Sequence, residues 1–419
     1  MTRSLTRRWA IDLRPLGVPA YRRMWLGNAV SFFGYQLTAV AVPVEMFAIT
    51  EDSFWVGLLG IAGLVPLMVF GLWGGAVADA VDRRRLLLAS SVLMWASTAG
   101  LLAQALLRVH SATLLLGLVA VQTVAFAISS PTRQAIVPRL VGPELLPAAN
   151  TLSFTTTSGS AVVGPLAAGL IFGVMGTEAG LPVAYGVDAL FFTVAFWATL
   201  RLPPIPPGEE RASMGLRSVV DGIRYLATTP VLLLSFAIDL IAMVLAMPRA
   251  LFPEVAEERF GGGAAVGWLF SAIAIGSVIG GLTSGWIGRV RRQGVALTAA
   301  VVAWGVAVGV SGFARQLWLV VLLLAFAGAA DLVSAVYRQS ILQTYAPDRY
   351  QGRLQGVFIT VVAGGPRLGD LRAGAMAAPW GVTLAWAGGG FAAALLALVL
   401  VLAFPALLRY QISSADGQR

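Results

Sequence analysis

Cysteine and lysine are both missing from this sequence of 419 residues, and His110 is its one histidine. Without cysteine the chain forms no disulfide, thiolate metal site or cysteine nucleophile, and one histidine cannot build a histidine metal cluster. No Walker-type phosphate loop and no pairing of a nucleophile with a base is visible. We therefore expect no catalytic residue, no metal site and no cofactor, and a protein that is not an enzyme.

Charge is also scarce, because Asp, Glu, Lys and Arg make up 12% of the chain, against about a quarter of a soluble domain. Hydrophobic residues make up 58%, and the mean hydropathy is +0.81. A helix needs about 20 apolar residues to cross a bilayer. The sequence therefore predicts an all-α membrane protein with twelve transmembrane helices, at 24–47, 55–78, 86–107, 112–134, 148–174, 182–200, 231–252, 264–287, 294–312, 317–342, 354–378 and 381–408.

One stretch between the sixth and seventh predicted helices is rich in proline and charge, which is typical of a linker. Part of it has apolar residues on one helical face, so we expect an amphipathic helix lying on the membrane surface. The predicted divisions are two six-helix bundles, a linker and two tails, at 1–23 (tail), 24–200 (bundle), 201–230 (linker), 231–408 (bundle) and 409–419 (tail).

Arginine placement predicts the orientation in the membrane. With the N-terminus in the cytoplasm, the cytoplasmic segments hold 21 arginines and the outward loops hold three: Arg108, Arg259 and Arg315. This bias follows the positive-inside rule and places both termini in the cytoplasm. It also accounts for the net charge of +9 without a nucleic-acid partner.

An internal repeat relates the two bundles. Residues 56–75 align without gaps on residues 266–285, with seven of 20 positions identical. Two shorter echoes follow in the same order, TRQAI with YRQSI and VGPLAAG with GGPRLGD. Three echoes in one order favour two six-helix halves in parallel orientation.

A charged loop follows the second predicted helix. Its residues Gly75, Asp79, Arg83 and Arg84 fit the pattern Gly-x-x-x-Asp-x-x-Gly-Arg-Lys/Arg, with Asp82 in place of the second glycine. With twelve spans, this loop resembles that of the major facilitator superfamily. The resemblance implies a gate that closes the cytoplasmic side in one conformation, while the simpler reading is that the arginines only anchor topology.

A second motif lies in the fifth predicted helix, where Gly159, Gly164, Pro165 and Gly169 resemble the Gly-Pro motif of exporters in this superfamily. Small residues also serve ordinary helix packing. Three stretches, VAVPVEMFAIT, GGAVADAVDRRR and AGGPRLGDLRAG, are most similar to the enterobactin (siderophore) exporter branch and its actinobacterial relatives. Macrolide exporters share the first two in looser form. The resemblance implies a monomer in the bacterial cytoplasmic membrane.

Five acidic residues fall inside predicted spans, where an unpaired charge is costly. Glu45, Asp239 and Asp331 are the candidates for proton coupling, although each could instead be paired with an arginine. Asp188 and Asp370 are the other two. By its place in the sixth span, Asp188 is expected close to the outer surface.

Buried arginines are equally unusual. Arg367 and Asp370 are three residues apart on the eleventh predicted helix and so can pair, which would leave Arg372 for a partner or an anionic substrate. Arg133 and Arg338 hold matching places in the two halves and are candidates for the inner gate, or for interfacial contacts.

These observations predict an exporter of a siderophore or similar amphipathic small molecule, driven by the proton gradient and working by rocker-switch alternating access. Its partners would be the substrate, protons and the lipid bilayer. The alternatives are a broad-specificity drug or macrolide exporter, and a lipid flippase or non-transporting membrane protein on the same fold.

Overall fold

The computed structural model describes residues 12–80, 82–202, 224–345 and 348–410, without the side chains of 71–80 and 83 and of several positions within 131–135 and 345–360. Every regular element in this part of the chain is helical. Most of the predicted linker falls outside the described residues. The helices are α1 (Pro19–Thr50), α2 (Ser53–Ala80), α3 (Arg83–Leu107), α4 (Ala112–Val141), α5 (Leu146–Leu200), α7 (Pro230–Ala246), α8 (Phe252–Phe260), α9 (Ala264–Leu282), α10 (Gln293–Ser311), α11 (Leu317–Tyr345) and α12 (Asp348–Ala403), with short 3-10 turns at Arg14–Gly17, Arg249–Leu251 and Ser284–Arg289.

Two of these helices are each long enough for two spans. α5 reverses at Gly176 (φ 74°, ψ 170°) and α12 reverses at Gly381 (φ 78°, ψ 153°). A side chain with a Cβ is disfavoured at such positive φ, which is why glycine occupies both turns. Ten described helices are long and apolar enough to cross a membrane. Counting α5 and α12 twice gives the twelve predicted spans, and the all-α membrane architecture is confirmed.

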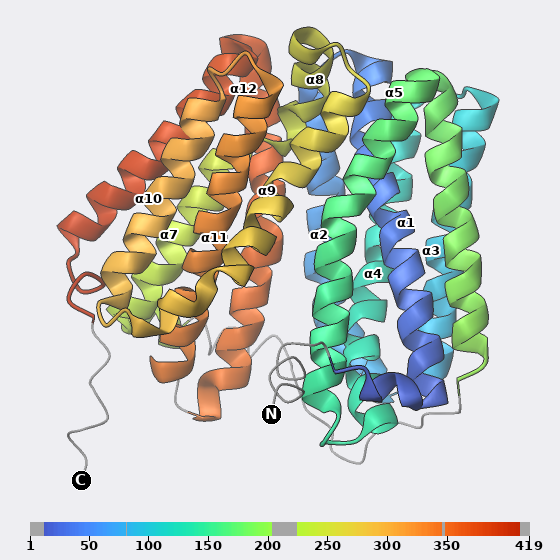
Figure 1. The fold of residues 1–419 in the computed structure, drawn as a ribbon, viewed down its shortest axis with the longest axis horizontal. Coiled ribbons are helices and arrows are strands. Elements are labelled where there is room, and N and C mark those ends of the chain that lie inside the picture. Colours follow the sequence, from blue (N-terminus) through green and yellow to red (C-terminus); the bar gives the residue numbers. More distant parts are fainter. Residues whose placement is uncertain (1–11, 81, 203–223, 346–347, 411–419) are drawn as a thin grey trace, which may run out of the picture.

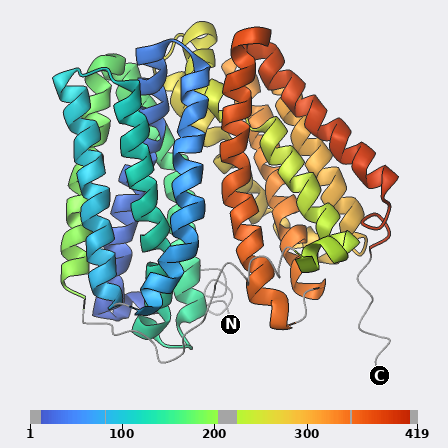
Figure 2. The same ribbon diagram turned by 180° about the vertical axis from the view of Figure 1, so that it is seen from behind.

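The helices form two bundles, one built from α1–α5 and the other from α7–α12, which stand side by side in Figures 1 and 2. The turns at Gly176 and Gly381 lie at the same end of the molecule, as do the loops that join α1 to α2 and α8 to α9. We call this end the far face. The opposite end, where α1 begins and the second half of α5 ends, is the terminal face.

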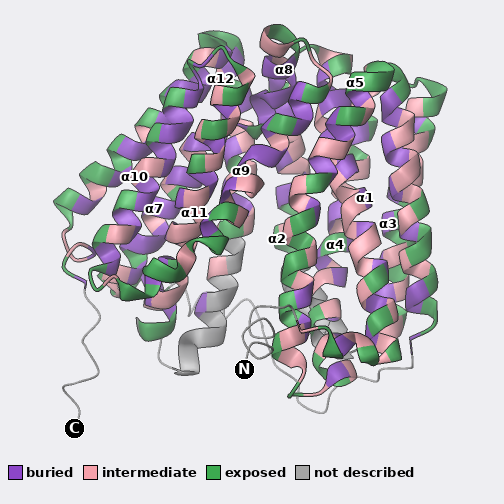
Figure 3. Cartoon of the chain, viewed as in Figure 1, coloured by how far each residue is buried: buried purple, intermediate pink, exposed green. Residues whose placement is uncertain are grey.

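Large apolar side chains cover the outside of both bundles. In Figure 3 the exposed residues follow the outer surfaces and the buried residues the interior. The most exposed apolar side chains include Val174, Leu282 and Leu107, with exposed fractions of 77%, 83% and 75%. A soluble monomer rarely exposes such a continuous apolar surface. The surface therefore fits lipid contact, and the chain is a multi-pass membrane protein.

The bundles meet along two helix pairs, α5 with α9 and α2 with α12, and glycines make this contact close. A Cβ added to Gly169 would lie 2.7 Å from the Cα atom of Gly267, and one added to Gly57 would lie 2.7 Å from the Asp370 carbonyl oxygen. Small residues let helix backbones approach in this way inside a membrane. We call this contact the seam.

The seam is closed on the far face. Ser53, at the start of α2, donates a hydrogen bond to the Glu254 carboxylate on α8, which joins the two bundles there. Figure 1 shows the helices of the two bundles converging toward the far face and diverging toward the terminal face. In the part of the chain that the structure describes, the contacts that hold the bundles together therefore lie toward the far face.

Candidate functional site

The C-terminal bundle holds a network of three charged side chains, of which Arg338 and Asp239 are buried and Asp331 is 31% exposed. Arg338 on α11 forms ion pairs with Asp239 on α7 and, at 3.8 Å, with Asp331 on its own helix. Arg338 and Asp239 are 4% and 2% exposed, so their charges depend on each other for stability. One guanidinium serves two carboxylates. The sequence left open that Asp239 and Asp331 are paired with an arginine, and the structure shows this pairing within one bundle.

The N-terminal bundle holds Glu45 in a network without an arginine. The Tyr185 hydroxyl donates a hydrogen bond of 2.6 Å to one Glu45 oxygen, and the Gln104 amide donates one of 3.1 Å to the other. All three side chains are at least 96% buried. Two donors stabilise the carboxylate in place of a countercharge.

Asp188 lies deeper in the same bundle, and sequence reasoning placed it wrongly. The second half of α5 runs unbroken from the turn at Gly176 to Leu200. Asp188 is therefore twelve residues from each end, in the middle of the helix and not close to the outer surface. The error came from starting the span at Pro182, which the helix in fact includes. The Thr38 hydroxyl donates a hydrogen bond of 2.6 Å to the Asp188 carboxylate.

Arg367 lies on α12 at the seam and reaches into a small pocket between the bundles. The pocket is lined by Tyr35, Gln122, Thr123, Phe126 and Arg367. The Tyr35 and Phe126 rings are stacked, with centroids 6.4 Å apart and planes at 10°. The Nη1 atom of Arg367 is buried and has no hydrogen-bond partner. The pocket thus combines an unsatisfied cation with aromatic faces.

The predicted ion pair between Arg367 and Asp370 is not present among the described residues, although both face α2. The Arg367 guanidinium packs against Gly63, whereas Asp370 packs against Gly60. Long side chains on a helix point back toward its N-terminus. The guanidinium therefore extends away from Asp370, which is three residues further along α12.

Arg372 donates its hydrogen bonds to backbone carbonyls and does not line the pocket that contains Arg367. Its guanidinium donates to the carbonyl oxygens of Val244 (3.3 Å), Leu245 and Ala385 (2.8 Å). Val244 and Leu245 belong to the last turn of α7, where carbonyls lack helical partners and a cation is favourable. Arg372 therefore caps α7 and ties it to the last span, and Arg367, which sequence reasoning assigned to Asp370, is the arginine that faces the pocket.

We predict that Arg372→Ala lowers the thermal stability of the purified protein more than Arg372→Lys. Each lost hydrogen bond from a charged donor costs about 1.5–3 kcal/mol, and three carbonyls lose their donor. Lysine keeps a charge near the helix end and satisfies part of this need. Unfolding followed by tryptophan fluorescence in detergent measures the order, and equal midpoints for the two variants would contradict the capping role.

Arg133 and Arg338 do not meet at a gate in this conformation. Arg133 donates a hydrogen bond of 2.7 Å to the Asn28 amide oxygen, which links α4 to α1 within the N-terminal bundle. Each arginine is therefore bound inside its own half. Their symmetric role as inner-gate residues stays a prediction for the other conformation.

Part of the charged loop can be described. Asp82 caps α3 by accepting a hydrogen bond of 3.0 Å from the Arg85 amide, which explains an aspartate where the motif has glycine. Arg84 donates a hydrogen bond of 2.6 Å to the Leu200 carbonyl at the end of α5. The side chains of Asp79 and Arg83, and the surroundings of Gly75, lie outside the described residues, so their gating role stays a prediction.

The Gly-Pro motif of α5 serves two neighbours. A Cβ added to Gly164 would run into the Gln36 side chain of α1, while Gly169 faces Gly267 of α9. Pro165 also faces α9, since its carbonyl oxygen would be 2.5 Å from a Cβ at Gly267. Gly159 has no atom within 4 Å of such a Cβ. The motif therefore builds the seam at Pro165 and Gly169 and packs the N-terminal bundle at Gly164.

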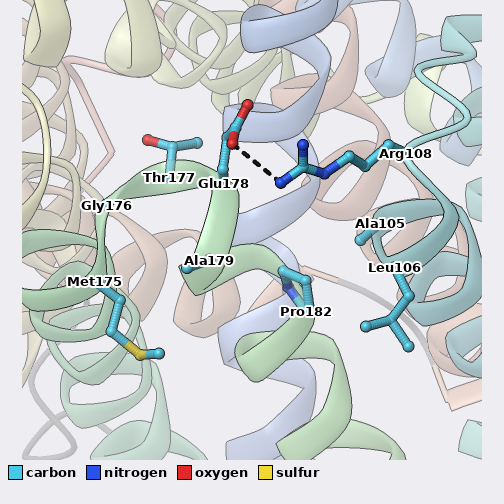
Figure 4. Close-up of a pocket in the computed structure, with 9 residues that line it drawn as sticks. All are labelled: Ala105, Leu106, Arg108, Met175, Gly176, Thr177, Glu178, Ala179 and Pro182. Carbon is cyan, nitrogen blue, oxygen red and sulfur yellow. Dashed lines mark hydrogen bonds and ion pairs between the residues drawn. The ribbon is translucent and has the colours of Figure 1, made fainter.

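A hollow on the far face contains an exposed ion pair. Figure 4 shows Glu178, beside the turn of α5, directed toward Arg108 at the end of α3, with 3.5 Å between the charged atoms. Their side chains are 78% and 71% exposed. An exposed pair of this kind contributes about 0–1 kcal/mol, and we assign this hollow no function.

Comparison with known proteins gives the family. The model of the family described as "transmembrane secretion effector" matches residues 10–416. The enterobactin exporters EntS of Escherichia coli O157:H7 and of Shigella boydii serotype 18 are each 29% identical to this chain, over 98% of it and 99% of their own length.

Solved transporters share the fold. The nucleoside transporter NupG aligns with a TM-score of 0.73 at 15% identity, over 94% of this chain and 100% of its own. A bacterial homologue of the iron transporter ferroportin, in an inward-facing state, aligns with a TM-score of 0.68 at 17% identity, over 93% and 99%. These relatives are transporters and not enzymes, as the sequence predicted. The chain belongs to the transmembrane secretion effector family of the major facilitator superfamily, and it is a membrane transporter.

Proposed function

We propose that this protein exports a siderophore or a similar amphipathic, anionic small molecule, using the proton gradient and alternating access. The observation that carries the proposal is Arg367 in the pocket between the bundles, with a buried Nη1 atom that has no hydrogen-bond partner. A buried guanidinium nitrogen without a hydrogen-bond partner is costly, and an anionic acceptor would satisfy it. A catecholate or carboxylate group would supply that anion.

The aromatic faces of the pocket favour a ligand with rings. Tyr35 and Phe126 are stacked on each other beside Arg367, and an aromatic ring that enters as the bundles separate can extend this stack. Gln122 and Thr123 add hydrogen-bonding groups to the same pocket. Enterobactin, which the relatives at 29% identity are named for exporting, carries groups of this chemistry and is the first probe to use.

Alternating access is supported by the asymmetry of the seam. The bundles are joined on the far face by Ser53 and Glu254, and they diverge toward the terminal face. The arginine bias assigns the terminal face to the cytoplasm, so we take this conformation to be open inward and ready to load substrate. Proton coupling would use the membrane carboxylates, for which Glu45, Asp239 and Asp331 are the candidates from the sequence.

Everted membrane vesicles that accumulate enterobactin under an imposed pH gradient test this proposal. We expect Arg367→Gln to lower uptake at least about tenfold, because losing a hydrogen-bonded charge contact costs about 1.5–3 kcal/mol. Arg108→Gln is the matched control, since Arg108 is exposed on the far face and its ion-pair partner among the described residues is the exposed Glu178. Its uptake should stay within about twofold of wild type, because an exposed pair contributes little.

Two outcomes would replace the proposal with one of its alternatives. Loss of macrolide uptake together with unchanged enterobactin uptake in Arg367→Gln would favour a drug or macrolide exporter. No pH-gradient-dependent flux of either compound in wild-type vesicles would favour a lipid flippase or a protein that does not transport.

A further inference from the structure

Asp188 is the most isolated charge-bearing group of the N-terminal bundle. Its side chain is 0% exposed, in the middle of the second half of α5. With about 1.5 Å of rise per residue, twelve residues separate it from either helix end by about 18 Å. An ionised carboxylate at that depth needs a countercharge or several hydrogen-bond donors.

The surroundings of Asp188 provide hydroxyl groups and no cation. Thr38 on α1 donates to Oδ2 at 2.6 Å, whereas Oδ1 is buried without a hydrogen-bond partner. Thr98 on α3 faces the same carboxyl group, and Gly34 of α1 leaves room for Oδ1 by having no side chain. No ion pair to Asp188 occurs among the described residues. Its titratable neighbour is Tyr185, one turn earlier on α5, which binds Glu45.

Three other acids within the spans have partners that Asp188 lacks. Asp239 and Asp331 share Arg338, and Glu45 accepts hydrogen bonds from Tyr185 and Gln104. The arginines of α1 and α3 lie within the first two turns of those helices, at the terminal face, and Arg133 of α4 is bound to Asn28. A neutral, protonated carboxyl group is the form that this position accommodates without a countercharge.

A chain of polar contacts connects Asp188 to the pocket at the seam. Thr98, which faces the carboxyl group, accepts a hydrogen bond of 3.3 Å from the Gln122 amide. Both are at least 94% buried. Gln122 also lines the pocket that contains Arg367. The path therefore has three side chains and ends where the substrate would bind.

We propose that Asp188 is a proton-binding site of the transport cycle, occupied by a proton in this conformation and linked to the substrate pocket through Thr98 and Gln122. The inference rests on the proposed function, because it assigns a role in that cycle. Binding and release involve only the proton, which leaves the carboxyl oxygen as H⁺ while the carboxylate remains.

The link acts through the direction of hydrogen bonds. The Gln122 amide nitrogen donates to Thr98 in this conformation. The Thr98 oxygen has a second lone pair, so it can also accept from a protonated Asp188 carboxyl group. A carboxylate only accepts, so loss of the proton draws the Thr98 hydroxyl proton toward Asp188. Release of the proton therefore changes the hydrogen bonding of Thr98, the residue that holds Gln122 beside the pocket.

Infrared difference spectroscopy tests the protonation without any substrate. A protonated carboxyl group has a C=O stretching band that shifts in D₂O. We expect this band in wild-type protein at neutral pH, its loss in Asp188→Asn, and its retention in Glu45→Gln and in Glu178→Gln, whose carboxylate is exposed. Thr38→Val keeps the acid and removes its donor, so the band should persist at a shifted frequency.

Transport assays then separate this inference from the proposed function. Asp188→Asn should abolish enterobactin accumulation driven by the pH gradient while exchange of labelled for unlabelled enterobactin across the vesicle membrane continues. Retention of the band in Asp188→Asn, or gradient-driven accumulation equal to wild type, would overturn the inference. If wild-type vesicles fail to carry enterobactin, the proposed function fails, and the infrared bands still decide whether Asp188 holds a proton.

Discussion

Arg338→Met lowers the free energy of unfolding by about 3–5 kcal/mol, because removing one member of a buried charge network leaves its partners uncompensated. Arg338 is the cation that forms ion pairs with both Asp239 and Asp331. Methionine has a similar length and keeps the packing, so the loss comes from the charge. Unfolding midpoints measured by tryptophan fluorescence in detergent report the effect.

Arg338 contacts two acids, whereas each acid contacts one arginine, and this difference provides a control. Asp239→Asn leaves Arg338 paired with Asp331 at 3.8 Å, so its destabilisation should be clearly smaller than that of Arg338→Met. The combined variant Asp239→Asn, Asp331→Asn, Arg338→Met removes all three charges and should regain most of the stability, since replacing a whole buried network is often nearly neutral. Equal midpoints for Arg338→Met and Asp239→Asn would show that the network does not act as described.

The number and type of the elements were predictable from the sequence, because twelve apolar stretches of bilayer length leave little choice in a chain that is 12% charged. The two turns inside α5 and α12 were less predictable. Each depends on a single glycine, Gly176 and Gly381, in a stretch where many other glycines are helical. Hydropathy does not distinguish a glycine with positive φ from one that packs against a neighbouring helix.

The partners of the buried charges were only partly predictable. The i, i+3 spacing of Arg367 and Asp370 put both on the face toward α2, but the direction of the arginine side chain along the helix decided that they do not pair. Arg338 was recognised as unusual, yet its partner Asp239 is about a hundred residues away. The separation of two residues in the sequence does not tell which helices are neighbours. The sequence alone therefore does not identify such pairs.

Gly267→Val should shift the protein away from the conformation described here, and this shift is the second large effect that we expect. A Cβ at this position would lie 2.5 Å from the Pro165 carbonyl oxygen and 2.9 Å from the Gly169 Cα atom. Both are backbone atoms of α5, so α5 and α9 must separate to make room. Overpacking of this kind costs about 1–3 kcal/mol, which corresponds to about a 5- to 150-fold change in the ratio of two conformations.

The absence of native cysteine makes that shift measurable. Ser53 and Glu254 are in hydrogen-bond contact across the far face. Because cysteine is shorter than glutamate, the pair Ser53→Cys and Glu254→Cys should cross-link readily with a short bifunctional thiol reagent in an otherwise unchanged chain. Adding Gly267→Val should greatly reduce cross-linking and raise the labelling of both cysteines from the far face.

Gly159→Val is the matched control for this experiment. Gly159 belongs to the same Gly-Pro motif on α5 as Gly169, but a Cβ there would have no atom within 4 Å. Cross-linking between positions 53 and 254 should therefore remain at the parent level. If Gly267→Val also leaves it unchanged, the glycine contact is compatible with both conformations, and the seam between α5 and α9 does not set which side of the protein is open. If only Gly267→Val reduces it, the small residues of this seam control access to the pocket at Arg367, because closure of the far face then requires the close approach of the α5 and α9 backbones.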